Sequence, residues 1–195
     1  VNSPETPIFQ KSKFLYGLPQ SKSVIREKNC AVLVEGQMDF LMSWQDGLKN
    51  VVATSGTALT SDQLTLLKRA SAEQLILSFD SDVAGQNATE RSIDLASAQD
   101  FLIKVLVVKG GKDPADIVRS QPGLIAQLVD QALLAMDYYF NSYLNQNILK
   151  GNTNIFQKKK NLRLILSKIK IIGSPIERSS WLKALAVRSG IEENI

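Results

Sequence analysis

Along residues 30–108, short apolar runs alternate with segments in which apolar residues recur at the spacing of a helix. Each run is flanked by polar residues, a pattern typical of strands that are buried on both faces of a parallel sheet. The alternation predicts an α/β fold with a central parallel sheet flanked by helices. The expected strands are 31–34, 50–53, 75–79 and 103–108, and the expected helices between them are 38–46, 61–70 and 84–98.

Beyond residue 114 the hydrophobic pattern favours helices only, and it predicts a C-terminal helical bundle. A capping box, in which a hydroxyl and a carboxylate or amide three residues apart satisfy free backbone N–H groups, is predicted to open the last helix at Ser174 and Glu177. Thr60 and Gln63 form the same motif before helix 61–70. The expected C-terminal helices are 123–143, 155–170 and 175–188, with a polar linker at 151–154.

The N-terminal residues are mixed in character. A glycine and a proline break the pattern within 15–19, and a short helix is expected over 21–28. We therefore expect a lead-in at 1–29, a sheet domain at 30–122 and a helical subdomain at 123–195.

The residue inventory excludes several classes of site. The 195 residues include no histidine and a single cysteine, Cys30. Neither a Ser–His–Asp nor a Cys–His pair can therefore form, and an internal disulfide is impossible. No apolar stretch approaches the roughly 18 residues of a membrane span, and the first residues lack a signal peptide. We expect a cytoplasmic protein, and, because the chain begins with Val1, part of a longer one.

Charge is distributed unevenly along the chain. Residues 30–125 carry 12 acidic and 8 basic side chains, whereas residues 1–29 carry 2 and 5, and residues 151–195 carry 3 and 9. An acidic centre between basic flanks suits a metal site that receives a polyanion. For residues 151–195 alone, a solvated lysine-rich helix face is the alternative explanation.

Acidic residues follow two of the predicted strands. Glu35 follows strand 31–34, and Asp80 and Asp82 follow strand 75–79. Ligand sites in parallel sheets form at the carboxyl ends of strands, and carboxylates held together there repel one another unless a cation lies between them. Oxygen ligands suit Mg²⁺ or Mn²⁺. Glu35 would complete the coordination shell or accept a proton, and Asp39 lies one helical turn after Glu35, facing the same site.

Two further positions each allow two interpretations. Asp113 precedes a predicted helix, where it could be a metal ligand or a plain N-cap. The loop 54–58 could cradle a phosphate or form an ordinary turn. A P-loop nucleotidase is excluded because the chain has no Gly-x-x-x-x-Gly-Lys-Ser/Thr sequence.

Together these residues resemble the Toprim domain, the metal-binding module of topoisomerases and primases, and then more closely the bacterial DnaG-type primases. The resemblance covers nearly the whole chain. The motifs that carry it are Asn2-Ser3-Pro4-Glu5-Thr6-Pro7-Ile8-Phe9, Leu15-Tyr16-Gly17-Leu18, Val34-Glu35-Gly36-x-Met38-Asp39, Gly56-Thr57-Ala58-Leu59-Thr60, Phe79-Asp80-x-Asp82-x-Ala84-Gly85 and Gly111-Lys112-Asp113-Pro114.

The resemblance implies the Toprim domain and the C-terminal helical part of a primase RNA-polymerase core. An amino-terminal zinc-binding domain, the first part of the core and a helicase-binding domain are expected to lie outside these 195 residues. Three positions depart from the family pattern: Gln37 replaces a usual tyrosine, Ser81 a common glycine and Ala115 a frequent aspartate.

The resemblance also implies roles for individual residues. Catalytic and metal-binding roles are expected for Glu35, Asp80 and Asp82, further metal binding for Asp39 and Asp113, and contacts with nucleic acid or nucleotide for Lys11, Lys13 and Lys112.

The expected function is synthesis of short RNA primers on single-stranded DNA with two or more Mg²⁺ or Mn²⁺ ions. The expected partners are the template, nucleoside triphosphates, the RNA primer and a replicative helicase, bound through a domain outside this chain. We expect a monomer, and weak or no activity from these 195 residues alone. The alternative is a Toprim nuclease or topoisomerase fragment. A topoisomerase needs a nucleophilic tyrosine, and packing better explains Tyr16, Tyr138, Tyr139 and Tyr143.

Overall fold

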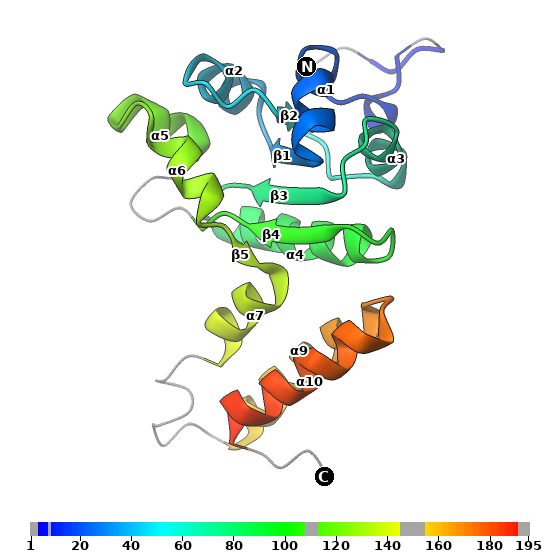
Figure 1. Cartoon of the computed structure of the whole chain (residues 1–195), viewed down its shortest axis with the longest axis vertical. Helices are drawn as coiled ribbons and strands as arrows, with labels where there is room; N and C mark the ends of the chain where they lie inside the picture. The colour runs from blue at the N-terminus through cyan, green and yellow to red at the C-terminus, as the bar shows by residue number, and fades with distance from the viewer. Residues whose placement is uncertain (1–3, 8, 108–112, 145–154, 191–195) are drawn as a thin grey trace. The chain divides into compact units, whose positions relative to one another are not determined.

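The computed structural model describes residues 4–7, 9–107, 113–144 and 155–190. It forms two compact units, Val1–Leu133 and Leu134–Ile195. The elements of the first unit are η1 (Lys11–Lys13), α1 (Leu18–Lys28), β1 (Cys30–Val34), α2 (Gln37–Gln45), β2 (Val51–Ala53), α3 (Ser61–Arg69), β3 (Gln74–Ser78), α4 (Val83–Ser97), β4 (Leu102–Val105), α5 (Pro114–Ser120) and α6 (Leu124–Asp130) (Figure 1).

The strands of the first unit confirm the predicted parallel sheet. The strand order is β2-β1-β3-β4-β5, where β5 is Leu133–Leu134, and β1 pairs in parallel with β2 and β3, as β3 does with β4. In this register Val34 lies opposite both Ala53 and Ser78. The carboxyl ends of β1, β2 and β3 therefore lie at the same end of the sheet, where the acidic residues were expected.

The sheet is buried on both faces. Alternate side chains of β1 point to opposite faces; Val32 and Val34 join one apolar cluster, whereas Ala31 and Leu33, on the other face, are also fully buried. Figure 1 shows α2, α5 and α6 together on one side of the strands. These helices supply the cluster residues Phe40, Ile117, Val118, Ile125 and Val129.

Helix α1 begins earlier than expected. The sequence predicted a break at 15–19, but α1 starts at Leu18 with Pro19 in its first turn, where the missing N–H of proline is not needed. Gly17 precedes the helix with a φ of 78°, and a Cβ there would lie 2.0 Å from the Phe40 ring. Both the backbone angle and the close packing therefore require glycine.

The prediction of one helix over 123–143 is wrong. Helix α6 ends at Asp130, and β5 joins the edge of the sheet before the next helix starts. Strand β5 forms because the edge strand of a sheet has unpaired backbone N–H and C=O groups with which another segment can pair. The spacing of hydrophobic residues within 123–143 does not indicate such pairing. The strand expected at 103–108 is also shorter in the structure and ends at Val105.

The second unit is helical, as expected. It contains α7 (Ala135–Tyr143), α9 (Ile155–Ile171) and α10 (Pro175–Ser189), and α9 contacts both of the others. Its core includes the buried rings of Tyr139 and Phe140, and the Phe140 ring meets Trp181 edge-on at 5.8 Å. Within the described ranges, no helix has the length and apolar character needed to cross a bilayer. The predicted linker at 151–154 lies outside the described residues.

Candidate metal centre

Glu35 is the first residue after β1, and the neighbouring loop holds its backbone. Its carbonyl oxygen accepts hydrogen bonds from the backbone N–H groups of Ser55, at 2.9 Å, and Gly56, at 3.4 Å. The backbone amides of the loop 54–58 thus support Glu35, which favours the ordinary-turn interpretation over a phosphate cradle. The side chain is half-buried, and its Oε1 atom has no hydrogen-bond partner among the described residues.

Asp80 and Asp82 lie in the loop between β3 and α4. Asp82 is the N-cap of α4, because its Oδ1 accepts a hydrogen bond from the Gly85 N–H at 2.7 Å. Gly85 in turn packs directly on the backbone of Asp80, where an added Cβ would lie 2.1 Å from the Asp80 carbonyl oxygen. Close packing against a glycine therefore fixes this acidic loop.

The carboxylates affect one another's charge. Burial raises the pKa of Glu35, and the charge of Asp80 raises it further, against a hydrogen bond from the Asp80 backbone that lowers it. The pKa of Asp80 is also raised, first by burial and then by the charges of Asp39 and Asp113. Carboxylates from three segments of the chain thus repel one another, and a bound divalent cation would reduce this repulsion.

Asp39 differs from the other acids because it is buried, with 7% of its surface exposed. Its Oδ2 accepts a hydrogen bond from the Gly36 N–H at 3.0 Å, and its Oδ1 accepts one from the Ala115 N–H at 3.3 Å. Burial raises its pKa and the two backbone hydrogen bonds lower it, with a net rise. Asp39 lies near the other acids, as expected, but backbone amides contact both of its oxygens.

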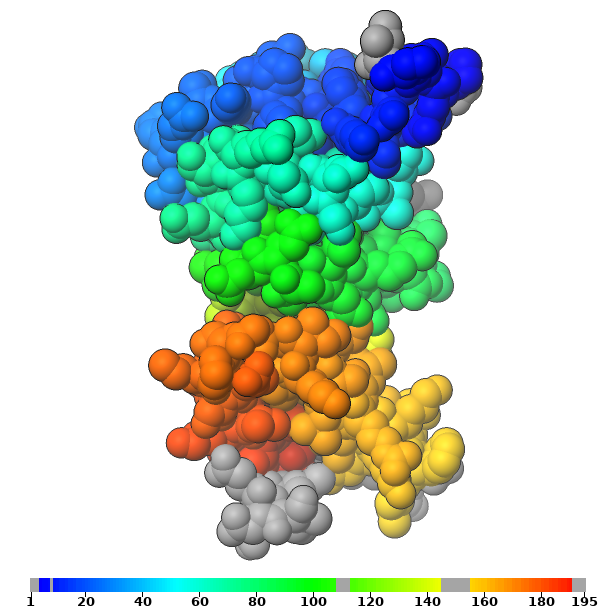
Figure 2. All heavy atoms as spheres, turned by 90° about the vertical axis from the view of Figure 1, so that its right-hand side faces the viewer, coloured from blue at the N-terminus to red at the C-terminus, as the bar shows by residue number. Residues whose placement is uncertain are grey.

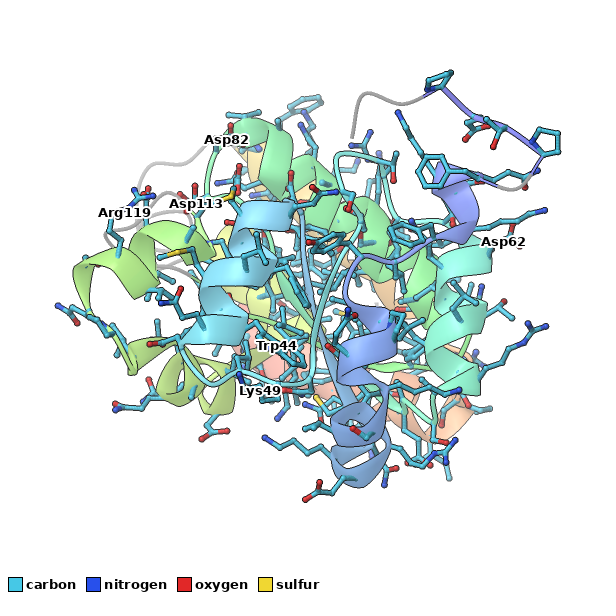
Figure 3. The ribbon with its side chains drawn as sticks, turned by 90° about the horizontal axis from the view of Figure 1, so that it is seen from above. Trp44, Lys49, Asp62, Asp82, Asp113 and Arg119 are labelled. Atoms are coloured by element: carbon cyan, nitrogen blue, oxygen red, sulfur yellow. The ribbon has the colours of Figure 1, made fainter. Side chains whose placement is uncertain are left out.

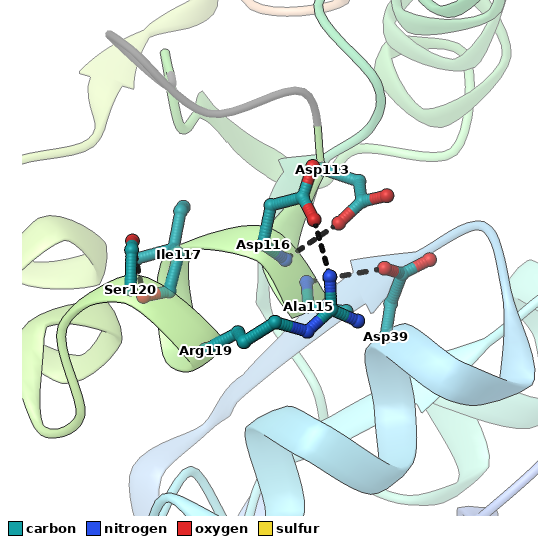
Figure 4. Close-up of polar contacts among 7 residues, drawn as sticks. All are labelled: Asp39, Asp113, Ala115, Asp116, Ile117, Arg119 and Ser120. Atoms are coloured by element: carbon teal, nitrogen blue, oxygen red, sulfur yellow. Dashed lines mark hydrogen bonds and ion pairs between the residues drawn. The ribbon is translucent and has the colours of Figure 1, made fainter.

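Asp113 is the N-cap of α5, since its Oδ1 accepts a hydrogen bond from the Asp116 N–H at 2.7 Å (Figure 4). Asp116 in turn pairs with Arg119 at 2.9 Å. Figure 3 shows Asp82, Asp113 and Arg119 toward one side of the molecule, with Asp62 on the other. The N-cap interpretation of Asp113 is therefore confirmed. Its second oxygen takes no part in this cap, so a ligand role stays open.

The donor set fits a hard divalent cation. The buried Oε1 of Glu35 has no partner among the described residues, and an anionic oxygen in that state is costly unless a cation binds it. Asp80, and the second oxygens of Asp82 and Asp113, would add oxygen ligands of the kind that Mg²⁺ and Mn²⁺ bind. Within the part of the chain that the structure describes, no group of three or more Cys, Asp or Glu side chains is arranged so that it could hold a metal ion. Binding would therefore require these side chains to turn toward the ion.

The predicted nucleic-acid contacts lie on a different element. Lys11 and Lys13 belong to η1, which packs on α3, as Figure 2 shows where the blue N-terminal segment meets the blue-green one. The fully buried Gln63 holds η1 by donating its side-chain N–H groups to the carbonyls of Lys11, at 3.2 Å, and Phe14, at 2.9 Å. Neither lysine amine is paired with an acid among the described residues. Lys112 lies outside them.

Sequence reasoning missed two residues that shape these sites. Gln63 was predicted only as part of a capping box, which the structure confirms, and nothing in the local pattern signals its bonds to η1. Gly85 was noted only within a motif. Its position directly after the acid-bearing turn is the signal that could have marked a close backbone approach.

Comparison with known proteins places this geometry in a family. A family described as Toprim-like matches residues 32–118, which include most of β1, all of β2, β3 and β4, and Glu35, Asp80 and Asp113. The DNA primase of Clostridium acetobutylicum is 37% identical to the chain over 195 residues, which cover 99% of the chain and 32% of that protein. The chain is a relative of the bacterial DNA primases. It spans about a third of the length of the curated primases it matches.

Solved primase structures agree with this assignment. The E. coli primase catalytic core matches with a TM-score of 0.82 at 28% identity, over 100% of the chain and 62% of that structure. A DnaG primase catalytic domain bound to single-stranded DNA matches with a TM-score of 0.79 at 28% identity, over 96% of the chain and 60% of that structure. Both the Toprim-like sheet and the helical C-terminal region thus have counterparts in primase cores, which confirms the predicted fold.

Proposed function

We propose that this chain is the metal-binding part of a DNA primase core, which joins ribonucleotides on a single-stranded DNA template. The observation that carries the proposal is the shared acidic field of Glu35 and Asp80 at the carboxyl ends of β1 and β3, on a fold matched by primase cores. The known association of one related catalytic domain with single-stranded DNA supports the choice of template.

Each residue group has a role in this proposal. Glu35, Asp80, Asp82 and Asp113 would hold two or more Mg²⁺ or Mn²⁺ ions, and such ions would supply charge neutralisation for phosphoryl transfer and activation of the primer 3′-hydroxyl. The carboxylates fix where the triphosphate and the hydroxyl lie relative to each other. Lys11, Lys13 and Lys112 bind the phosphates of template or nucleotide, without reading base sequence. A helicase would bind elsewhere in the whole protein, which we expect to be monomeric and cytoplasmic.

A Toprim nuclease or topoisomerase activity is not favoured. The relatives that match nearly the whole chain are DNA primases. The tyrosines also give no support to a topoisomerase, since aromatic packing accounts for them. Tyr16 packs against Phe40, and Tyr138 and Tyr143 both pack against the fully buried Tyr139.

The test is synthesis of a dinucleotide from nucleoside triphosphates on a single-stranded template, under single-turnover conditions with Mg²⁺ or Mn²⁺. It uses this chain and a longer primase that contains it, each also with Asp80→Ala. We expect product from the longer protein, and a loss of about 100- to 1,000-fold with Asp80→Ala, because a group that stabilises transition-state charge is removed. Asp62→Ala, which removes the same charge from exposed α3, is the matched control and should keep the rate.

The outcomes separate the candidate activities. Product from the 195 residues alone would show that they suffice, against our expectation of weak or no activity. Nicking of the template that depends on Asp80, without any dinucleotide, would replace the primase proposal with a nuclease.

A further inference from the structure

Asp39 is the one acid of the described cluster for which hydrogen bonds to both carboxylate oxygens are seen. Both donors are backbone N–H groups, of Gly36 at 3.0 Å and of Ala115 at 3.3 Å. Glu35 is the opposite case, because its Oε1 is buried without a partner in the described residues. The two neighbouring acids therefore use their oxygens differently: Asp39 engages the backbone with both, whereas Glu35 keeps one available to a ligand.

The two amides that Asp39 accepts from belong to two of the acid-bearing segments, the loop after β1 and the first turn of α5. Gly36 directly follows Glu35, and Ala115 lies two residues after Asp113. The bond to Ala115 spans 76 positions of sequence (Figure 4). It crosses the packed pair α2 and α5, since Asp39 lies in the first turn of α2 and Ala115 in the first turn of α5. Asp39 thus joins the loop that carries Glu35 to the turn that carries Asp113.

The local backbone is adapted to this arrangement. A Cβ on Gly36 would lie 2.8 Å from Oδ2 of Asp39, closer than side-chain atoms normally approach. The carboxylate therefore lies directly against the loop that carries Glu35. A charged acceptor for backbone N–H groups forms strong, directional hydrogen bonds, which suits a residue that fixes geometry.

We propose that Asp39 is a positioning residue and not a metal ligand. It holds the Glu35 loop and the Asp113 turn at a fixed separation, so that the carboxylates of Glu35 and Asp113 can bind the same ion. The catalytic consequence rests on the proposed function, whereas the bridge between the two loops does not. This inference replaces the metal-ligand role that sequence resemblance implied for Asp39.

The bridge is tested first in metal-free protein, by amide hydrogen exchange of the complete chain. We expect the Gly36 and Ala115 amides to exchange at least about tenfold faster in Asp39→Ala than in the parent, because each loses its acceptor. Asp39→Asn keeps one carbonyl oxygen and should protect one of the two amides; it also serves if Asp39→Ala does not fold. Asn50→Ala is the matched control. It removes a buried polar side chain at the opposite end of β1 and β2, and should leave both amides protected.

The second arm uses bound Mn²⁺ and counts the water molecules on the ion by magnetic resonance. Loss of a protein ligand adds a water, so Glu35→Ala should add one. Asp39→Asn should leave the number unchanged. In the longer primase, Asp39→Asn should lower kcat about tenfold at saturating metal, because reacting groups are misplaced. The Mn²⁺ concentration for half-maximal rate should change less than about threefold, and Asn50→Ala should alter neither value.

Two results would overturn the proposal: equal amide exchange in Asp39→Ala, Asp39→Asn and parent, or one extra water on Mn²⁺ in Asp39→Asn. The proposed function fails separately, through the absence of dinucleotide product from the parent. In that case amide exchange still decides whether Asp39 bridges the two loops.

Discussion

The amino ends and the carboxyl ends of the same parallel strands lie in opposite electrostatic surroundings. At the amino ends of β1 and β2, the buried Asn50 donates its side-chain N–H to the Cys30 carbonyl at 3.0 Å. Burial raises the pKa of the Cys30 thiol there, while the charges of Lys104 and Lys28 act to lower it. At the carboxyl ends, burial raises the pKa of Glu35, and the neighbouring charges of Asp80, Asp39 and Asp82 raise it further.

Both ends have a buried side-chain oxygen without a partner in the described residues, such as Oδ1 of Asn50 at the amino end and Oε1 of Glu35 at the carboxyl end. The difference lies in charge. A neutral amide oxygen in that position costs a modest amount of stability, whereas a carboxylate among other carboxylates calls for a cation. The amino end therefore serves stability, whereas the ion binding that we propose for the carboxyl end would come at a cost in stability.

Of the substitutions considered, Gly85→Ala should have the largest effect, because it should disturb the Asp80 loop at the carboxyl end of the sheet. An exposed glycine in a helix usually gains stability on replacement by alanine, but here the new Cβ would lie 2.1 Å from the Asp80 carbonyl oxygen. We expect a loss of about 1–3 kcal/mol in the free energy of unfolding, because the loop must shift. Affinity for Mn²⁺ should fall with it. Urea unfolding and a binding isotherm measure the two.

Gly173→Ala is the matched control for this substitution, since a Cβ at Gly173 would have nothing within 4 Å and the backbone φ there is not positive. It should change the free energy of unfolding by less than about 0.5 kcal/mol. A Gly85→Ala protein as stable as Gly173→Ala would show that the packing of Gly85 does not hold the Asp80 loop.

Asn50→Ala should weaken the amino end alone. It removes a buried hydrogen bond and leaves the Cys30 carbonyl without its donor, which should cost about 1–3 kcal/mol of unfolding free energy. Mn²⁺ affinity should stay that of the parent. An Asn50→Ala protein that loses stability and metal affinity together would mean that the two ends are not independent.

Stability of the metal-free protein should depend on pH through the carboxyl end. Glu35, Asp39 and Asp80 all have a raised pKa in the folded state, so the folded protein binds more protons than the unfolded chain just above the unfolded pKa values of about 4. The stability that these groups contribute is present below that pH and is lost as the pH rises through the folded values. Urea unfolding between about pH 4 and pH 8 measures the loss.

Glu35→Gln isolates one of these contributions, because it keeps the shape of the side chain and removes the charge. Its stability relative to the parent should increase as the pH rises, and bound Mn²⁺ should reduce the difference. A constant difference between the two proteins across the pH range would contradict the repulsive field at this end of the sheet.

Arg119→Ala should have the smallest effect. The Arg119–Asp116 ion pair is exposed, with 69% and 35% of the two side chains accessible, and such pairs contribute little. We expect a change below about 0.5 kcal/mol in unfolding free energy, measured in urea. A loss several times larger would show that this ion pair contributes to holding the Asp113 turn in place.

The parts of the fold that sequence could predict are those determined locally. The apolar runs of β1 and β3, the capping box at Thr60 and the N-cap at Ser174 depend on residues within a few positions, and the structure confirms them. The reciprocal half of the capping box expected at Ser174 is not seen in the described residues, because the Glu177 carboxylate accepts a hydrogen bond from Trp181 instead. Because strand ends collect at one edge of a parallel sheet, the closeness of Glu35 and Asp80 was also predictable.

The rest depends on pairs that are distant in sequence. Gln63 reaches Lys11 across 52 positions, and Asp39 reaches Ala115 across 76. No periodicity encodes such contacts, and an acid that accepts two backbone hydrogen bonds has the same sequence signature as a metal ligand. Strand β5 was missed for the same reason, since its partner is the edge of a sheet formed by earlier residues.

The most direct test of the central claim is a calorimetric Mn²⁺ titration of this chain, its Glu35→Gln variant and its Asp62→Asn variant. Asp62→Asn removes an equal charge from exposed α3, outside the acidic cluster. We expect the parent and Asp62→Asn to bind Mn²⁺ with equal affinity and Glu35→Gln to bind at least about tenfold more weakly, because it lacks an anionic ligand. Equal affinities in all three proteins would contradict a metal centre at the carboxyl ends of β1 and β3.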